Sequence, residues 1–160
     1  SAASDVYKRQ ELDNITIEVD KTRTEKFYKN QIGFTCTCPD CTSYVAKIDK
    51  VRMHLNGLDL KLGIDLTKEV GQGMDELMGH ENDDHHLYVI PYYISGKCFI
   101  DNVELEVQQS GPIWPNTKRA EYKLTDDLAL LIINTTGDIE FDNSESVLSV
   151  WLEYKTEPLN

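Results

Sequence analysis

The sequence is short of positive charge. Its 160 residues include 16 lysines and arginines against 28 aspartates and glutamates, so the formal net charge is −12 at pH 7. Proteins that bind DNA, RNA or anionic membranes neutralise phosphates with many lysines and arginines. We therefore expect no nucleic-acid partner and no membrane surface. A pocket for one small phosphate stays open, because a few cations are enough for it.

Long apolar runs are also missing. The longest, Leu128 to Ile133, suits a buried strand and falls far short of the roughly 20 residues that cross a bilayer. The N-terminus has neither the charged nor the apolar region of a signal peptide. Four cysteines without an export signal point to a reducing compartment. We therefore expect the protein in the cytoplasm.

No recognisable catalytic or nucleotide-binding motif occurs. The sequence contains no Gly-x4-Gly-Lys-Ser/Thr loop, no Gly-x-Gly-x2-Gly, no Gly-x-Ser-x-Gly and no His-Glu-x2-His. These patterns carry phosphate loops, dinucleotide sites, serine hydrolases and zinc peptidases respectively. We expect a protein that is not an enzyme and that requires no cofactor.

The first ten residues, Ser1–Gln10, look foreign to the rest. They resemble translated remnants of sequencing adapters, and we treat 1–10 as a leader outside the fold. Residues 11–160 are expected to form a single α+β domain. A chain of this length buries a core without disulfide staples, and no linker divides it.

Two helices are predicted in the N-terminal half. Asp20 or Thr22 caps the first, which runs to about Gln31. The second carries an apolar stripe at intervals of three and four residues, formed by Tyr44, Ile48, Val51, Leu55, Leu58 and Leu62. Gly57 lies off this stripe and is a place for the helix to bend.

Strands are predicted for the remainder, where apolar and polar residues alternate. They cover residues 15–19, 88–94, 98–107, 120–124, 128–133 and 147–154. Gly96 is expected to close one strand, and Asp101-Asn102 to form a bulge or a turn. Consecutive strands with short polar turns favour an antiparallel arrangement. The predicted fold is an N-terminal helical pair packed on an antiparallel β-sheet or sandwich.

A cysteine-bearing turn is the first candidate site. Cys36, Cys38 and Cys41 lie within six residues, and zinc takes four such ligands in a tetrahedron. The fourth ligand would be Cys98, or one of the histidines His80, His85 and His86. Structural zinc and plain buried thiols both remain open. A redox role for Cys38-x2-Cys41 is disfavoured, because the motif lies between two helices and not after a strand.

The segment from Gly111 to Arg119 is the second candidate site. Its two prolines restrict an indole that can stack on a base, and its cations can grip a phosphate. The candidate ligand-binding residues are Trp114, Asn116, Thr117, Lys118, Arg119, Tyr92 and Tyr93. The alternative is that this loop only connects two strands while Trp114 plugs the edge of the core.

Several of these features together resemble a family of small, uncharacterised bacterial and phage-associated proteins. They are Phe34, the Cys-x-Cys-x2-Cys turn, Leu62-Gly63-Ile64-Asp65 and the Tyr92-Tyr93 strand. Members of that family have a cysteine directly after the aromatic strand, where this sequence has Ser95. The resemblance brings no settled function, and it places the protein in the cytoplasm of a bacterial host cell.

The favoured function is binding without catalysis. We expect a protein that sequesters a small nucleotide-like molecule, in the form of a phage anti-defence sponge for a bacterial immune signal. One alternative is an acidic protein-interaction module, an immunity protein or inhibitor with structural zinc. Another is a zinc-dependent hydrolase built on the cysteines and histidines. A homo-oligomer is compatible with each of these.

Overall fold

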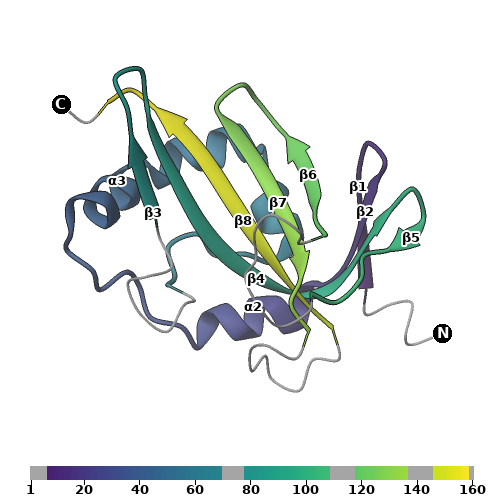
Figure 1. Cartoon of the computed structure of the whole chain (residues 1–160). Coiled ribbons are helices and arrows are strands. Elements are labelled where there is room, and N and C mark those ends of the chain that lie inside the picture. Colours follow the sequence, from purple (N-terminus) through teal and green to yellow (C-terminus); the bar gives the residue numbers. More distant parts are fainter. Residues whose placement is uncertain (1–6, 70–77, 109–117, 137–145, 159–160) are drawn as a thin grey trace.

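The computed structural model describes residues 7–69, 78–108, 118–136 and 146–158 (Figure 1). In this part of the chain eight strands form one sheet, and the order along its main path is β1-β2-β4-β8-β7-β6, with β3 and β5 each paired to β4. The strands are β1 (Tyr7–Leu12), β2 (Ile15–Asp20), β3 (Met78–Glu81), β4 (His86–Ile100), β5 (Val103–Glu104), β6 (Ala120–Lys123), β7 (Leu128–Asn134) and β8 (Val147–Thr156). All pairings between these strands are antiparallel.

The predicted fold of a helical pair packed on a sheet or sandwich is wrong. The antiparallel sheet dominates the described chain, and it is accompanied by three helices, α2 (Lys21–Lys29), α3 (Pro39–Leu55) and α4 (Leu58–Leu62). The second predicted helix is interrupted because Asn56 and Gly57 both take positive φ, 51° and 88°. A left-handed residue ends the hydrogen-bonding pattern of a helix, so α3 stops and α4 starts anew.

Strand β1 includes residues 7–10 of the expected leader. Tyr7 pairs with Asp20 and Leu12 with Ile15, and Asp13 turns the chain with a φ of 57°. The expected boundary at residue 10 therefore falls inside a strand. Backbone groups make this pairing, and every sequence has them. The side chains of residues 7–10 are mostly polar, so they show no alternation from which a strand could be predicted.

The long strand β4 serves two parts of the sheet. Residues 86–95 pair with β8, and residues 96–100 pair with β2. The prediction that Gly96 closes a strand is wrong, because β4 continues through it opposite Val19. A Cβ atom at Gly96 would lie 2.4 Å from the backbone oxygen of Glu18. Glycine stands here because a neighbouring backbone passes too close for any side chain.

Helix α3 packs its apolar stripe against one face of the sheet (Figure 1). The ring of Tyr44 lies 5.8 Å from that of Tyr88 on β4, and its hydroxyl lies 2.7 Å from that of Tyr92. Tyr92 in turn donates to the backbone oxygen of Leu66 at 2.8 Å. None of the described helices has both the length and the apolar character needed to cross a bilayer.

Helix α2 covers the edge of β4 between the stretches that pair with β3 and β2. The hydroxyl of Tyr28 donates to the backbone oxygen of Tyr93 at 2.9 Å and accepts from its backbone nitrogen at 3.0 Å. The backbone nitrogen of Ser95 donates to Thr24 Oγ1 at 3.1 Å. Because backbone groups alternate in direction along a strand, Pro91 faces this same edge. Two side chains thus replace a neighbouring strand here.

Candidate functional site

The cysteine turn brings three thiols together at the start of α3. The sulfur atoms of Cys36, Cys38 and Cys41 all lie within 4.8 Å of one another. Cys38 Sγ accepts from the backbone nitrogen of Cys41 at 3.4 Å and so caps the helix, and Cys36 Sγ accepts from the backbone nitrogen of Cys38 at 3.4 Å. Three thiols at this spacing could hold a metal ion.

The three thiols differ in exposure, and Cys38 and Cys41 also differ in acidity. Cys36 and Cys41 are buried, whereas Cys38 is exposed. The backbone N–H of Cys41, followed by the thiol of Cys36, lowers the pKa of Cys38. Burial, with the neighbouring thiols of Cys36 and Cys38, raises the pKa of Cys41. Cys38 is therefore more acidic than Cys41, and it is the most accessible of the three sulfurs.

Cys98, the expected fourth ligand, lies elsewhere. It is 1% exposed on β4, opposite Ile17 of β2, and burial raises its pKa to about 12. It does not belong to the group of thiols around Cys38, and within the described residues no histidine belongs to it either. His86 Nε2 lies 3.0 Å from Asp40 Oδ1, an ion-pair distance without the alignment of a hydrogen bond.

The residues expected to bind a ligand are not gathered in one place where they are described. Trp114, Asn116 and Thr117 lie outside the described residues. Lys118 Nζ is 2.6 Å from Glu106 Oε2, and Arg119 Nε is 2.7 Å from Glu121 Oε1. Both cations therefore already have carboxylate partners.

The two aromatic candidates serve the fold. Tyr92 is 1% exposed, and its hydroxyl is bonded inside the core, so a ligand cannot reach its ring. Tyr93 is half-buried, and its backbone is held by Tyr28 at the edge of β4. The Tyr92 ring is therefore not available as a stacking platform.

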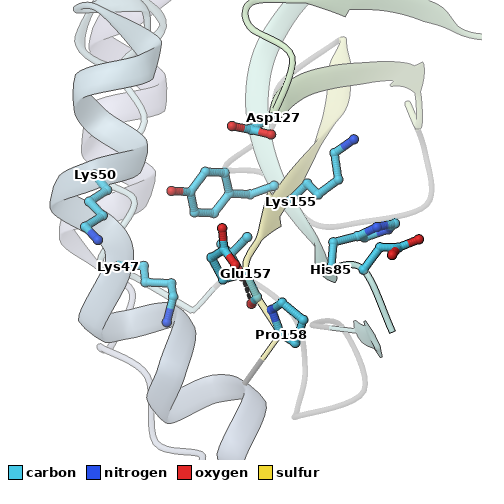
Figure 2. A pocket seen from close by; sticks show the side chains of 10 residues that line it. Lys47, Lys50, His85, Asp127, Lys155, Glu157 and Pro158 are labelled. Carbon is cyan, nitrogen blue, oxygen red and sulfur yellow. Dashed lines mark hydrogen bonds between the residues drawn. The ribbon is translucent and has the colours of Figure 1, made fainter. Parts of the chain in front are cut away.

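A cleft that the sequence did not indicate opens between α3 and the C-terminal end of β8, and we call it the α3–β8 cleft (Figure 2). Its volume is about 700 Å³. The lining residues are Lys47, Lys50, Asp84, His85, Asp127, Tyr154, Lys155, Thr156, Glu157 and Pro158. Figure 2 shows the two α3 lysines on one side and Lys155, His85 and Pro158 on the other.

Three ammonium groups line this cleft in an acidic protein. Lys47 Nζ donates to Ser43 Oγ at 2.9 Å and lies 5.9 Å from the centre of the Tyr88 ring. Among the described residues, no carboxylate lies within 4.0 Å of Lys47, Lys50 or Lys155. Elsewhere several lysines are paired, as Lys118 is with Glu106. The cleft thus keeps positive charge available to a ligand, although Asp84, Asp127 and Glu157 also line it.

Tyr154 forms an aromatic wall of the cleft and is largely buried, at 5% exposure. Its ring stacks against Tyr88 with centroids 6.5 Å apart and an interplanar angle of 22°, and His54 lies at 5.9 Å. Burial, then the charge of Asp127, raises the pKa of Tyr154. Its hydroxyl is therefore protonated at neutral pH and available as a hydrogen-bond donor. Ser43 and Tyr88 bond to each other through their hydroxyls beside the cleft.

Comparison of the chain with protein-family models, with curated proteins and with solved structures gave no match. The resemblance drawn from the cysteine turn and from Leu62-Gly63-Ile64-Asp65 therefore stays a prediction.

Proposed function

We propose that the protein is a non-enzymatic binding protein that sequesters a small anionic, nucleotide-like molecule in the α3–β8 cleft. The observation that carries the proposal is a set of three lysines around the Tyr154 wall, none of which has a carboxylate within 4.0 Å among the described residues. Trp114, Asn116 and Thr117 of the expected loop lie outside the described residues, so the proposal is argued from the cleft. Tight capture without turnover would let the protein act as a sponge for a bacterial immune signal.

The chemistry of the cleft favours a small phosphorylated ligand. Its volume of about 700 Å³ lies within the range of ordinary ligand pockets. Ammonium groups bind phosphate as point charges, and the Tyr154 hydroxyl can donate to an oxygen. The carboxylates of Asp84, Asp127 and Glu157 repel additional negative charge, as does the net charge of −12. A single phosphorylated molecule therefore suits the cleft better than a nucleic-acid strand.

Replacing Lys50 and Lys155 together by glutamine is expected to weaken binding of such a ligand about 100-fold. Each lysine would lose a charge-assisted contact of about 1.5 kcal/mol, and 1.4 kcal/mol corresponds to a factor of ten. The ligand is found by a thermal-shift screen of cyclic nucleotides and ADP-ribose derivatives, and its Kd is then measured by calorimetry.

The matched control replaces Lys8 and Lys61, which are exposed and do not line the cleft, by glutamine. It makes the same change in net charge and should leave Kd within about twofold. A screen in which no compound shifts the melting temperature would refute the proposal. So would equal weakening by both double variants, because the effect would then come from overall charge.

We also propose that Cys36, Cys38 and Cys41 hold a structural zinc ion. Three sulfurs within 4.8 Å of one another match the thiolate ligand set that zinc prefers, and a fourth ligand would complete the tetrahedron. The ion would tie the turn before α3 to the first turn of that helix. Its role would be to fix local structure.

Metal analysis of the purified protein is expected to give about one zinc per chain. Cys41→Ser should lose the metal and lower the melting temperature by about 5–10 °C, because a structural metal contributes a few kcal/mol to folding. Cys98→Ala is the control and should keep its zinc, since that thiol lies outside the cluster. Protein without bound metal, or loss of zinc from Cys98→Ala, would contradict the assignment.

A further inference from the structure

The cysteine cluster pairs one accessible thiol with two protected ones. Cys38 is exposed, while Cys36 and Cys41 are buried with their sulfurs within 4.8 Å. An oxidant in solution therefore meets Cys38 first. A thiol that can close a disulfide already stands beside it, as in cysteines that react reversibly with oxidants.

We propose that Cys38 is a peroxide-reactive modification site whose oxidation ends in a Cys38–Cys41 disulfide. In the first step the Cys38 sulfur attacks one peroxide oxygen, the O–O bond breaks, and sulfenic acid and water form from hydrogen peroxide. In the second step the Cys41 sulfur attacks the Cys38 sulfur, the S–O bond breaks, and a second water leaves. Two thiols are thereby oxidised and one peroxide is reduced to two waters.

Cys41 is the better partner for geometric reasons. Its backbone nitrogen already donates to Cys38 Sγ at 3.4 Å, so the two residues face each other across the first turn of α3. A disulfide requires Cβ atoms about 3.5–4.5 Å apart, whereas residues three apart on a regular helix stand at about 5–6 Å. Cys38 is the N-cap of α3 and has extended backbone (φ −63°, ψ 160°), so the bridge needs a shift only of the turn before the helix. Cys36 is separated from Cys38 by a single residue, and a bridge between them would close a strained ring.

The modification does not depend on the proposed metal. Free thiols react as described, and a bound zinc ion would be released as its ligands are oxidised. The two proposals are also tested by separate measurements: the thiol count tests the oxidation of Cys38, and the metal content tests the zinc site. Neither measurement depends on a ligand in the α3–β8 cleft.

The test treats the reduced, folded full-length chain with one equivalent of hydrogen peroxide and then counts thiols after denaturation. The count is expected to fall from the four cysteines of the sequence to two. The mass is expected to fall by about 2 Da, and a digest to show a Cys38–Cys41 linkage. Cys38→Ser is expected to lose no thiols, and serine caps helices well enough to keep the fold.

Two matched variants complete the test. Cys36→Ser and Cys98→Ala should each still lose two thiols, because neither residue takes part in the bridge. The proposal is overturned if Cys38→Ser still forms a disulfide, or if Cys36→Ser abolishes it. It is equally overturned if the bridge in the unmodified chain involves Cys98, joins two chains, or is replaced by sulfinic acid. Dithiothreitol should restore the full thiol count.

Discussion

Replacing Tyr28 by phenylalanine is expected to lower the free energy of unfolding by about 2–4 kcal/mol. The Tyr28 hydroxyl makes two hydrogen bonds to the backbone of Tyr93, one as donor at 2.9 Å and one as acceptor at 3.0 Å. Tyr28 is 2% exposed, so water cannot take over these bonds. Each broken bond to a buried backbone group costs about 1–3 kcal/mol. Urea denaturation monitored by circular dichroism measures the change.

Tyr122→Phe is the matched control. Tyr122 is half-buried on β6, and no hydrogen bond of its hydroxyl is found among the described residues. The same atom is deleted, yet the expected cost is about 0.5 kcal/mol or less. Equal losses in the two variants would show that Tyr28 does not act as a partner for the edge of β4.

Gly96→Ala is expected to cost about 3 kcal/mol and to disturb the junction of β2 and β4. The added Cβ would lie 2.4 Å from the backbone oxygen of Glu18 and 3.1 Å from Val19 Cα. Backbone atoms cannot rotate away as a flexible side chain can, so the two strands would have to separate. The change is read from the midpoint of urea denaturation.

Gly33→Ala provides the comparison for this experiment. A Cβ at Gly33 would have one neighbour, the backbone oxygen of Thr67 at an ordinary 3.7 Å. Alanine there also restricts the unfolded chain, so stability is expected to be unchanged or to rise by about 0.5 kcal/mol. If Gly96→Ala were as mild as Gly33→Ala, the close approach of β2 to β4 would be refuted.

The sequence predicts much of the local structure, because local patterns determine it. Asp20 accepts from the backbone nitrogen of Arg23 as the first helix cap, and Gly63 ends α4 with a φ of 78°. Asp101 and Asn102 make the expected turn, with φ of 50° and 66°. The alternation from residue 88 to 94 places its even-numbered side chains in the core. Each of these signals lies within a few residues of the feature that it predicts.

The sheet-dominated architecture could not be predicted in the same way. Residues 7–10 are polar, and they become a strand because β2 offers its backbone, which no local pattern reports. From the sequence, Gly96 is expected to end a strand. In the structure the strand continues, and a glycine is required there because the backbone of Glu18 passes too close for a side chain. Both features depend on contacts between segments, where tertiary structure overrides local preference.

The candidate sites also differ in whether their residues are close in sequence or are brought together only by the fold. The three cysteines of the cluster, Cys36, Cys38 and Cys41, are close in sequence, so their spacing alone predicts their grouping. The α3–β8 cleft joins Lys47 and Lys50 of a helix to Lys155 of the last strand, which only the fold brings together. Tyr92 was expected at a ligand, but Tyr44 and Leu66 engage its hydroxyl inside the core. Aromatic residues alone do not distinguish a stacking surface from a core.

Pro91 gives the middle of β4 a further property. It has no N–H, and its backbone nitrogen faces the edge that the Tyr28 side chain covers two residues further on. A foreign polypeptide approaching this edge would find no donor at Pro91 and a tyrosine ring where its own backbone would have to lie. Sheet proteins aggregate and exchange strands through unprotected edges. The middle of β4 is therefore protected from pairing with a strand of another molecule, and this protection requires neither a ligand nor a metal.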